Sequence, residues 1–167
     1  GYDLEMLTIK QMLEERKDCV VFDKHLKWSN AFLSAYQDVI QGLQGVDIYG
    51  IELQEDIPAP MHYHRIDHHN DMSSKPSSLE QVAAVLGIPL DRHKQLVAAN
   101  DSGYIPGMKA MGASEYEIGE IRRLDRAAQG INECDEKLAE QSITENLIRH
   151  DDLIIVRSLT SHFSPIC

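Results

Sequence analysis

Short apolar segments alternate with longer amphipathic ones along most of the chain. Four segments are short and rich in β-branched or apolar residues, which predicts strands; they are residues 19–22, 46–53, 61–66 and 152–158. Other segments repeat apolar residues at helical spacing, which predicts helices; they are residues 4–17, 28–43, 76–87, 89–101, 114–128 and 134–149. This alternation predicts an α/β fold in which a mostly parallel sheet is sandwiched between helices, a Rossmann-like three-layer arrangement. We expect residues 1–167 to form a single domain.

Two of the predicted helices carry informative polar residues. Ser77 and Glu80 have the spacing of a capping box, and Gly87 closes the same apolar stripe. Three arginines lie within about one turn of one another on the helix 114–128, and they are Arg122, Arg123 and Arg126. They could clamp a phosphate, but the glutamates around them favour a solvated, salt-bridged face.

Composition excludes several classes of protein. The net charge of −11 makes long duplex nucleic acid an unexpected partner, and no apolar run approaches the length of about 20 residues that spans a bilayer. The three cysteines are odd in number and widely spaced, and no basic and apolar leader is present, so neither a disulfide framework nor secretion is indicated. We therefore expect a cytoplasmic protein without a membrane partner.

Acidic and imidazole side chains follow three of the predicted strands. In a parallel sheet the carboxyl ends of the strands meet at one rim, so these residues are expected to lie close together. They are Asp23 and His25, then Glu52 and Asp56, then Asp67, His68 and His69. Imidazole and carboxylate together suit Mn²⁺, Mg²⁺, Fe²⁺ or Co²⁺, and thiolates are too few for a structural zinc site. Such ions activate water and neutralise phosphate oxygens, which predicts phosphoester hydrolysis.

Two motifs, "RIDHHN" at 65–70 and "VAANDSGYIPGM" at 97–108, resemble the DHH phosphoesterase family. This family includes family II inorganic pyrophosphatases, single-strand exonucleases, oligoribonucleases and cyclic-dinucleotide phosphodiesterases. The resemblance implies a DHH-domain-like fold in which His68 ligates a metal, His69 contacts the scissile phosphate, Asp67 supports the site and Asp101 ligates the metal pair. It also implies one or two ions, Mn²⁺ or else Mg²⁺ or Co²⁺. The implied substrate is a small phosphorylated molecule, a nucleotide or a short oligonucleotide.

The chain departs from the family in its first motif, His-x-x-x-Asp-x-Asp after a strand. In "DKHLKWSN", Asp23 stands in the place of the histidine, and Lys27 and Ser29 replace the two aspartates. Either Asp23 and His25 supply metal ligands in another register, or Lys27 replaces one ion and leaves a single-metal or non-catalytic site.

Two further elements of the family are altered. For the aspartate of the second motif, Glu52 is the first candidate and Asp56 the second. No segment of the sequence resembles the smaller C-terminal substrate-binding domain of the family, and we expect that domain to be absent or removed.

Two functions follow. The first is a metal-dependent phosphoesterase, a hydrolase of phosphodiester or phosphoanhydride bonds. The alternative, favoured by Lys27, is a catalytically degenerate DHH-fold domain that acts as a nucleotide-binding or assembly module. Both are compatible with a homodimer.

Overall fold

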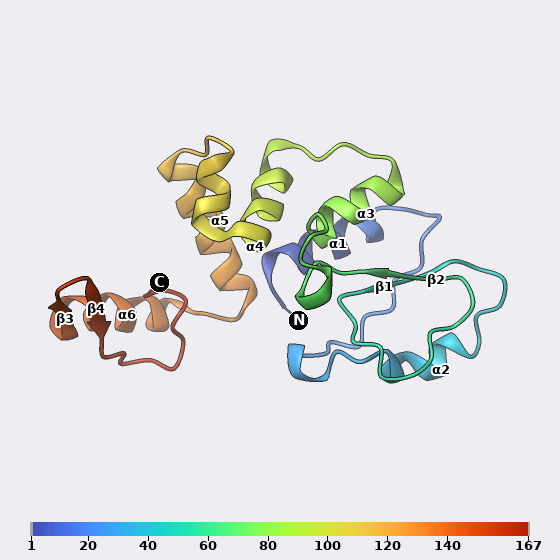
Figure 1. Cartoon of the computed structure of the whole chain (residues 1–167), viewed down its shortest axis with the longest axis horizontal. Helices are drawn as coiled ribbons and strands as arrows, with labels where there is room; N and C mark the ends of the chain where they lie inside the picture. Colours follow the sequence, from blue (N-terminus) through green and yellow to red (C-terminus); the bar gives the residue numbers. More distant parts are fainter. Residues whose placement is uncertain (1, 167) are drawn as a thin grey trace.

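Helices dominate residues 2–166, the part of the chain that the computed structural model describes (Figure 1). The α-helices are α1 (Leu4–Glu14), α2 (Gln37–Ile40), α3 (Ser78–Leu86), α4 (Arg92–Ala110), α5 (Glu115–Ala128) and α6 (Glu133–Asn146). The strands are β1 (Ile48–Ile51), β2 (Tyr63–Ile66), β3 (Leu147–His150) and β4 (Leu153–Val156). Short 3-10 turns cover Trp28–Asn30, Leu33–Tyr36 and Asn70–Met72. The fold is therefore mixed α/β, as the alternation of segments predicted.

The strands form two small pairs rather than one sheet. β1 and β2 are parallel, with Ile48 opposite Tyr63 and Ile51 opposite Ile66, whereas β3 and β4 form an antiparallel hairpin. Residues 2–166 contain no larger sheet, so the expectation of a three-layer, mostly parallel sheet was wrong. Segment 19–22 pairs with no strand in this part of the chain, and its Val20 side chain is 79% exposed. An apolar composition favours a strand, but it does not provide a second strand with which this segment could pair.

The helix predictions were accurate where local signals were strong. α3 begins at the capping box of Ser77 and Glu80 and ends at Gly87, whose φ of 66° is left-handed. Segment 28–43 instead forms two 3-10 turns and the four-residue α2. Its backbone is drawn into a parallel bridge, because the Gln54 N–H donates to the Ala31 carbonyl and the Gln54 carbonyl accepts from Leu33, both at 2.8 Å. These bonds compete with a continuous helix there.

α4 continues nine residues beyond residue 101, where the predicted helix ends, but it bends sharply. Tyr104 has φ 56° and ψ −148°, values outside the helical region, and Pro106 lies in the first turn after the break. The two halves of α4 pack so closely that a Cβ on Gly107 would lie 2.5 Å from the Ala99 carbonyl oxygen. Glycine is therefore required at position 107.

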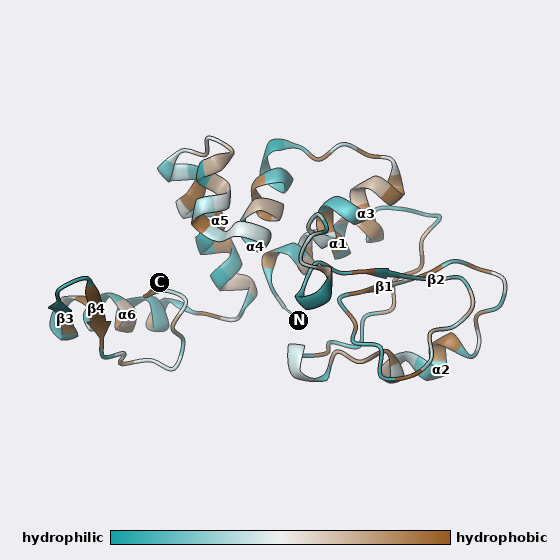
Figure 2. Ribbon diagram, in the orientation of Figure 1, coloured by the Kyte–Doolittle hydropathy of each residue, from teal (hydrophilic) through white to brown (hydrophobic). Residues whose placement is uncertain are grey.

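The core lies between α1, α3, α4 and α5, directly behind the ends of β1 and β2. Its buried members come from all four helices and from the last residue of β2, and they include Ile9, Ile66, Leu79, Val97, Met108 and Ile121. α5 carries both apolar and polar residues (Figure 2), and it buries Ile118 and Ile121 in the core, as expected for an amphipathic helix. The core thus fixes the relative positions of the segments that carry the candidate site.

The C-terminal elements α6, β3 and β4 lie to one side of the other helices (Figure 1). Arg126 of α5 is linked to Glu136 of α6 at 2.6 Å. No described helix is long and apolar enough to cross a membrane. Cys19 and Cys134 are free, and Cys167 lies outside the described residues.

Gly50 of β1 is covered by the aromatic ring of Tyr63 on β2. A methyl group at position 50 would overlap that ring, so Gly50→Ala is expected to lower the free energy of unfolding by about 1–3 kcal/mol. Urea unfolding measures the change. Gly119→Ala is the matched control, because the space around Gly119 within α5 is open, and alanine there should stabilise the helix by up to about 1 kcal/mol. Equal stability of Gly50→Ala and the wild type would contradict this packing.

Candidate metal centre

Parallel pairing brings the ends of β1 and β2 to the same edge. Glu52 follows β1 directly, and Asp67, His68 and His69 follow β2. The Glu52 N–H donates to the Ile66 carbonyl at 2.8 Å, which extends the pairing to the point where these side chains begin. The sequence-based expectation that acidic and imidazole groups gather at carboxyl ends of strands is met for this pair.

Four residues form a group that can hold a metal ion. Glu52, His68, His69 and Asp101 each offer one ligand atom, and these atoms lie within 4.8 Å of one another. His68 Nε2 is 2.6 Å from Asp101 Oδ2 and 3.7 Å from Glu52 Oε1. His69 Nε2 lies 3.6 Å from the same Glu52 oxygen. The group therefore joins the ends of both strands to the middle of α4.

Glu5 is a fifth member of this neighbourhood, and sequence reasoning missed it. Its Oε2 lies 3.6 Å from His68 Nε2, and its Oε1 accepts the N–H of Leu79 at 3.0 Å. Asp3, also buried, caps α1 two residues earlier. Asp3 and Glu5 are two acidic residues separated by one residue, and this spacing is the signal in the sequence that could have indicated them.

Four buried polar atoms of this neighbourhood make no hydrogen bond, and they are Glu5 Oε2, Glu52 Oε2, His68 Nε2 and Asp101 Oδ2. His68 Nε2 and Asp101 Oδ2 are close but not aligned for hydrogen bonding. Buried polar atoms are rarely left without a partner, because each costs about 1–3 kcal/mol. Three carboxylate oxygens and one imidazole nitrogen that converge without hydrogen bonds form a donor set suited to a divalent cation.

The ionisable groups of the site hold protons where no cation balances them. Burial raises the pKa of Glu52 to about 8 and that of Asp101 to about 7. The adjacent Glu5 carboxylate, with Asp101 and Glu52, raises the pKa of His68 to about 9. Burial opposes ionisation of Glu5 as well, but His68 and the Leu79 N–H lower its pKa. A divalent cation would replace the protons as the compensating charge.

Left-handed backbone conformations occur in three segments that carry these ligands. Glu52 has φ 52°, Asn70 has φ 51° and Tyr104 has φ 56°. Such conformations cost non-glycine residues about 1–3 kcal/mol each and are concentrated at functional sites. Here they turn the chain directly at Glu52, after His69 and three residues after Asp101.

Neighbouring polar groups orient the candidate ligands. Ser78 Oγ donates to Glu52 Oε1 at 2.8 Å. Asp67 Oδ1 accepts the His69 N–H at 2.9 Å, while its Oδ2 accepts from Arg65 at 2.6 Å. The Asp67 carboxylate is thus already occupied, and it supports the backbone of His69 rather than joining the group of ligands.

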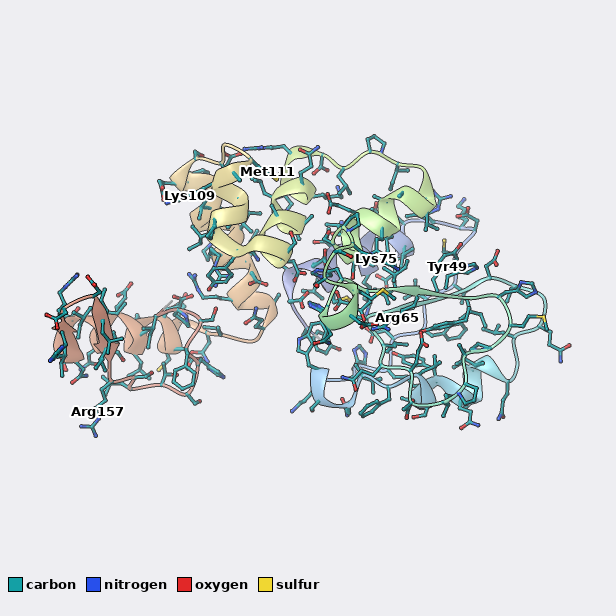
Figure 3. The ribbon with its side chains drawn as sticks, in the orientation of Figure 1. Tyr49, Arg65, Lys75, Lys109, Met111 and Arg157 are labelled. Atoms are coloured by element: carbon teal, nitrogen blue, oxygen red, sulfur yellow. The ribbon has the colours of Figure 1, made fainter. Side chains whose placement is uncertain are left out.

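A cavity of about 350 Å³ opens beside the group. It shares Glu52 and His69 with the group, and its other polar walls include Gln54, Arg65 and Asn70. Arg65 is labelled near the centre of the molecule in Figure 3. The His69 side chain is 42% exposed, so its imidazole stands between the buried ligands and the open cavity.

The structure does not bring Asp23, His25 or Asp56 into this group. Asp23 pairs with Lys10 Nζ at 2.8 Å, and His25 contacts Tyr2. Asp56 is exposed and accepts the Ser34 N–H at 2.9 Å. Of the two candidates for the second motif, Glu52 is therefore the one that lies beside His68.

Lys27, the residue that argued against a metal, lies outside this group as well. It is exposed, and it forms no ion pair with any carboxylate of residues 2–166. No ammonium from position 27 therefore takes the place of an ion among these ligands.

Comparison with protein-family models, with curated protein sequences and with solved structures found no match to this chain. The chemistry of these side chains is therefore the basis on which a function is assigned.

Proposed function

We propose that this protein is a metal-dependent phosphoesterase. It hydrolyses a phosphodiester or phosphoanhydride bond of a small phosphorylated substrate or short oligonucleotide, using one or two ions of Mn²⁺, Mg²⁺ or Co²⁺. The observation that carries the proposal is the convergence of four buried, unpartnered ligand atoms from Glu5, Glu52, His68 and Asp101. A purely structural cluster of this kind would leave several buried polar atoms without a hydrogen-bond partner, which is costly.

The residues of the chain have distinct roles in this proposal. A bound divalent ion supplies a Lewis acid and an acidified water for attack on phosphorus. Glu52, His68 and Asp101 hold it, with Glu5 alongside. His69, held through its N–H by Asp67, directs its imidazole at the phosphate oxygens in the cavity and stabilises their charge during displacement.

The resemblance to the DHH family supports the same proposal. "RIDHHN" places His68 and His69 after β2, and "VAANDSGYIPGM" places Asp101 on α4. Asp3 and Glu5 are two acidic residues separated by one residue, whereas Lys27 and Ser29 stand at that spacing in the segment 23–30. The alternative function, a degenerate nucleotide-binding or assembly module, depended on Lys27 as a substitute for a metal ion. Its exposed, unpaired position weakens that argument.

Hydrolysis by the purified wild type is the direct test of this function. Phosphate release would be measured for pyrophosphate, nucleotides, phosphodiesters and short oligonucleotides, each with Mn²⁺, Mg²⁺ and Co²⁺. We expect turnover that depends on the ion and is lost with a chelator. Absence of hydrolysis across all these combinations would refute the proposal.

His69→Ala separates phosphate contact from metal binding. Because the His69 imidazole faces the cavity, the variant is expected to lose about 100-fold or more in kcat while it still binds Mn²⁺. His64→Ala is the matched control, because His64 lies on β2, is exposed and pairs with Asp47. Full activity of the His69→Ala variant would show that His69 takes no part in the reaction.

A further inference from the structure

A buried ion pair on α5 lies next to the segments that carry the candidate ligands. Arg122 and Asp125 are each 5% exposed, and Arg122 Nη1 lies 2.9 Å from Asp125 Oδ2. The expectation that Arg122 lies on a solvated face was therefore wrong. Arg123, the next residue, has a side chain that is 57% exposed and pairs with Glu120, as expected for a solvated face. Arg122 turns inward because α5 presents it to the bend of α4.

Asp125 binds the segment that carries Glu5. Its Oδ1 accepts the N–H of Leu4 at 3.2 Å, and Leu4 is the residue between Asp3 and Glu5. Its other oxygen accepts from Arg122 and from Gln129 Nε2 at 3.1 Å. Both oxygens of Asp125 are thus occupied, and one of them fixes the first turn of α1.

Arg122 binds the segment that carries Asp101. Its Nη1 donates to Asn100 Oδ1 at 3.3 Å, and its Nη2 donates to the Tyr104 hydroxyl. The guanidinium carbon also lies 3.9 Å from the centroid of the Tyr104 ring. Asn100 immediately precedes Asp101, and Tyr104 is the residue at which α4 breaks. The guanidinium therefore spans the turn from which Asp101 projects.

The chemistry of this pair suits positioning better than stabilisation. A buried ion pair contributes little to stability, because desolvation of the two charges offsets their attraction. The planar guanidinium, however, donates at fixed angles to several acceptors at once, which a lysine ammonium does not reproduce. Here the acceptors belong to α4, to α5 and to Ser164 near the C-terminal end, at 3.1 Å.

We propose that Arg122 and Asp125 are positioning residues for the metal centre, which hold Asp101 and Glu5 at the distance that a shared cation requires. This inference rests on the proposed metal site. Neither residue is a ligand itself. Groups that orient metal ligands typically contribute a factor of about 10 to 100 in metal affinity.

Titration calorimetry with Mn²⁺ tests the proposal in the full chain. The variant Arg122→Met with Asp125→Leu removes both charges, so neither is left buried alone. Its Kd for Mn²⁺ is expected to rise about 10- to 100-fold. Arg122→Lys keeps the charge but loses the planar fork, and its Kd should also rise. The matched control is Arg123→Met with Glu120→Gln, which deletes the exposed pair of the same helix and should leave Kd unchanged.

The outcomes separate this inference from the function on which it rests. Suppose that the wild type binds Mn²⁺. If the folded double variant or the folded Arg122→Lys variant then binds Mn²⁺ as tightly as the wild type, the positioning role is overturned and the metal site stands. If the double variant does not fold, Arg122→Lys decides by the same criterion. A wild type without Mn²⁺ binding would refute the metal site, and the positioning role with it. The paramagnetic resonance spectrum of Mn²⁺ bound to Arg122→Lys should also differ from that of the wild type.

Discussion

Asp101→Asn is expected to weaken the binding of Mn²⁺ by at least about 100-fold. Asp101 Oδ2 is buried without a hydrogen-bond partner and lies 2.6 Å from His68 Nε2. Asparagine has nearly the same shape, but it removes the negative charge and introduces an amide that binds divalent ions weakly. Loss of a group that only supports a ligand costs about 10- to 100-fold in affinity. Loss of this ligand itself should therefore raise the Kd for Mn²⁺ by at least about 100-fold. Titration calorimetry measures the change.

Asp56→Asn is the matched control for this substitution. Asp56 is also an aspartate after β1, but it is exposed and bonded to Ser34. Its replacement should leave Kd unchanged. Tight Mn²⁺ binding by Asp101→Asn would show that α4 supplies no ligand. Loss of Mn²⁺ binding in Asp56→Asn would show that the metal site does not lie beside Glu52.

Mn²⁺ affinity is expected to rise steeply with pH between about 6 and 9. In the metal-free protein the pKa values of Asp101, Glu52 and His68 are raised to about 7, about 8 and about 9. Binding must displace these protons, and each proton released makes affinity increase about tenfold per pH unit. Calorimetry in buffers of different ionisation enthalpy counts the protons. Equal affinity at pH 6 and pH 8, with no proton release, would contradict this arrangement of charges.

The same shifts set the sign of the stability change. These three groups bind protons more tightly in the folded protein than in the unfolded chain, so the stability they contribute at low pH is lost as pH rises through about 7 to 9. The lowered pKa of Glu5 affects stability only at pH values below this range. Mn²⁺ should therefore restore stability most strongly at the alkaline end.

Local sequence signals were sufficient for part of the structure. The cap at Ser77, the end of α3 at Gly87 and the placement of His68 and His69 after a strand all depend on neighbouring residues, and the structure agrees with them. The pairing of segment 19–22 did not follow from its composition. A strand needs a partner from another part of the chain, and an apolar run does not specify one.

The positions of Glu5 and Arg122 depend on long-range packing, which the sequence did not predict. Glu5 reaches the site because α1 lies against α3, and its carboxylate accepts an N–H from Leu79, 74 residues away. Arg122 is buried because α4 bends at Tyr104 and exposes acceptors to it. Neither contact has a periodic signal in the sequence. Only the spacing of Asp3 and Glu5 could have indicated the first of them.

Anomalous scattering from crystals soaked in Mn²⁺ tests the central claim most directly. The peak should lie among Glu5, Glu52, His68 and Asp101, at about 2.0–2.6 Å from their ligand atoms, and the number of peaks gives the number of ions. A map with no peak among these residues, or with a peak only beside Asp23 and His25, would contradict the site.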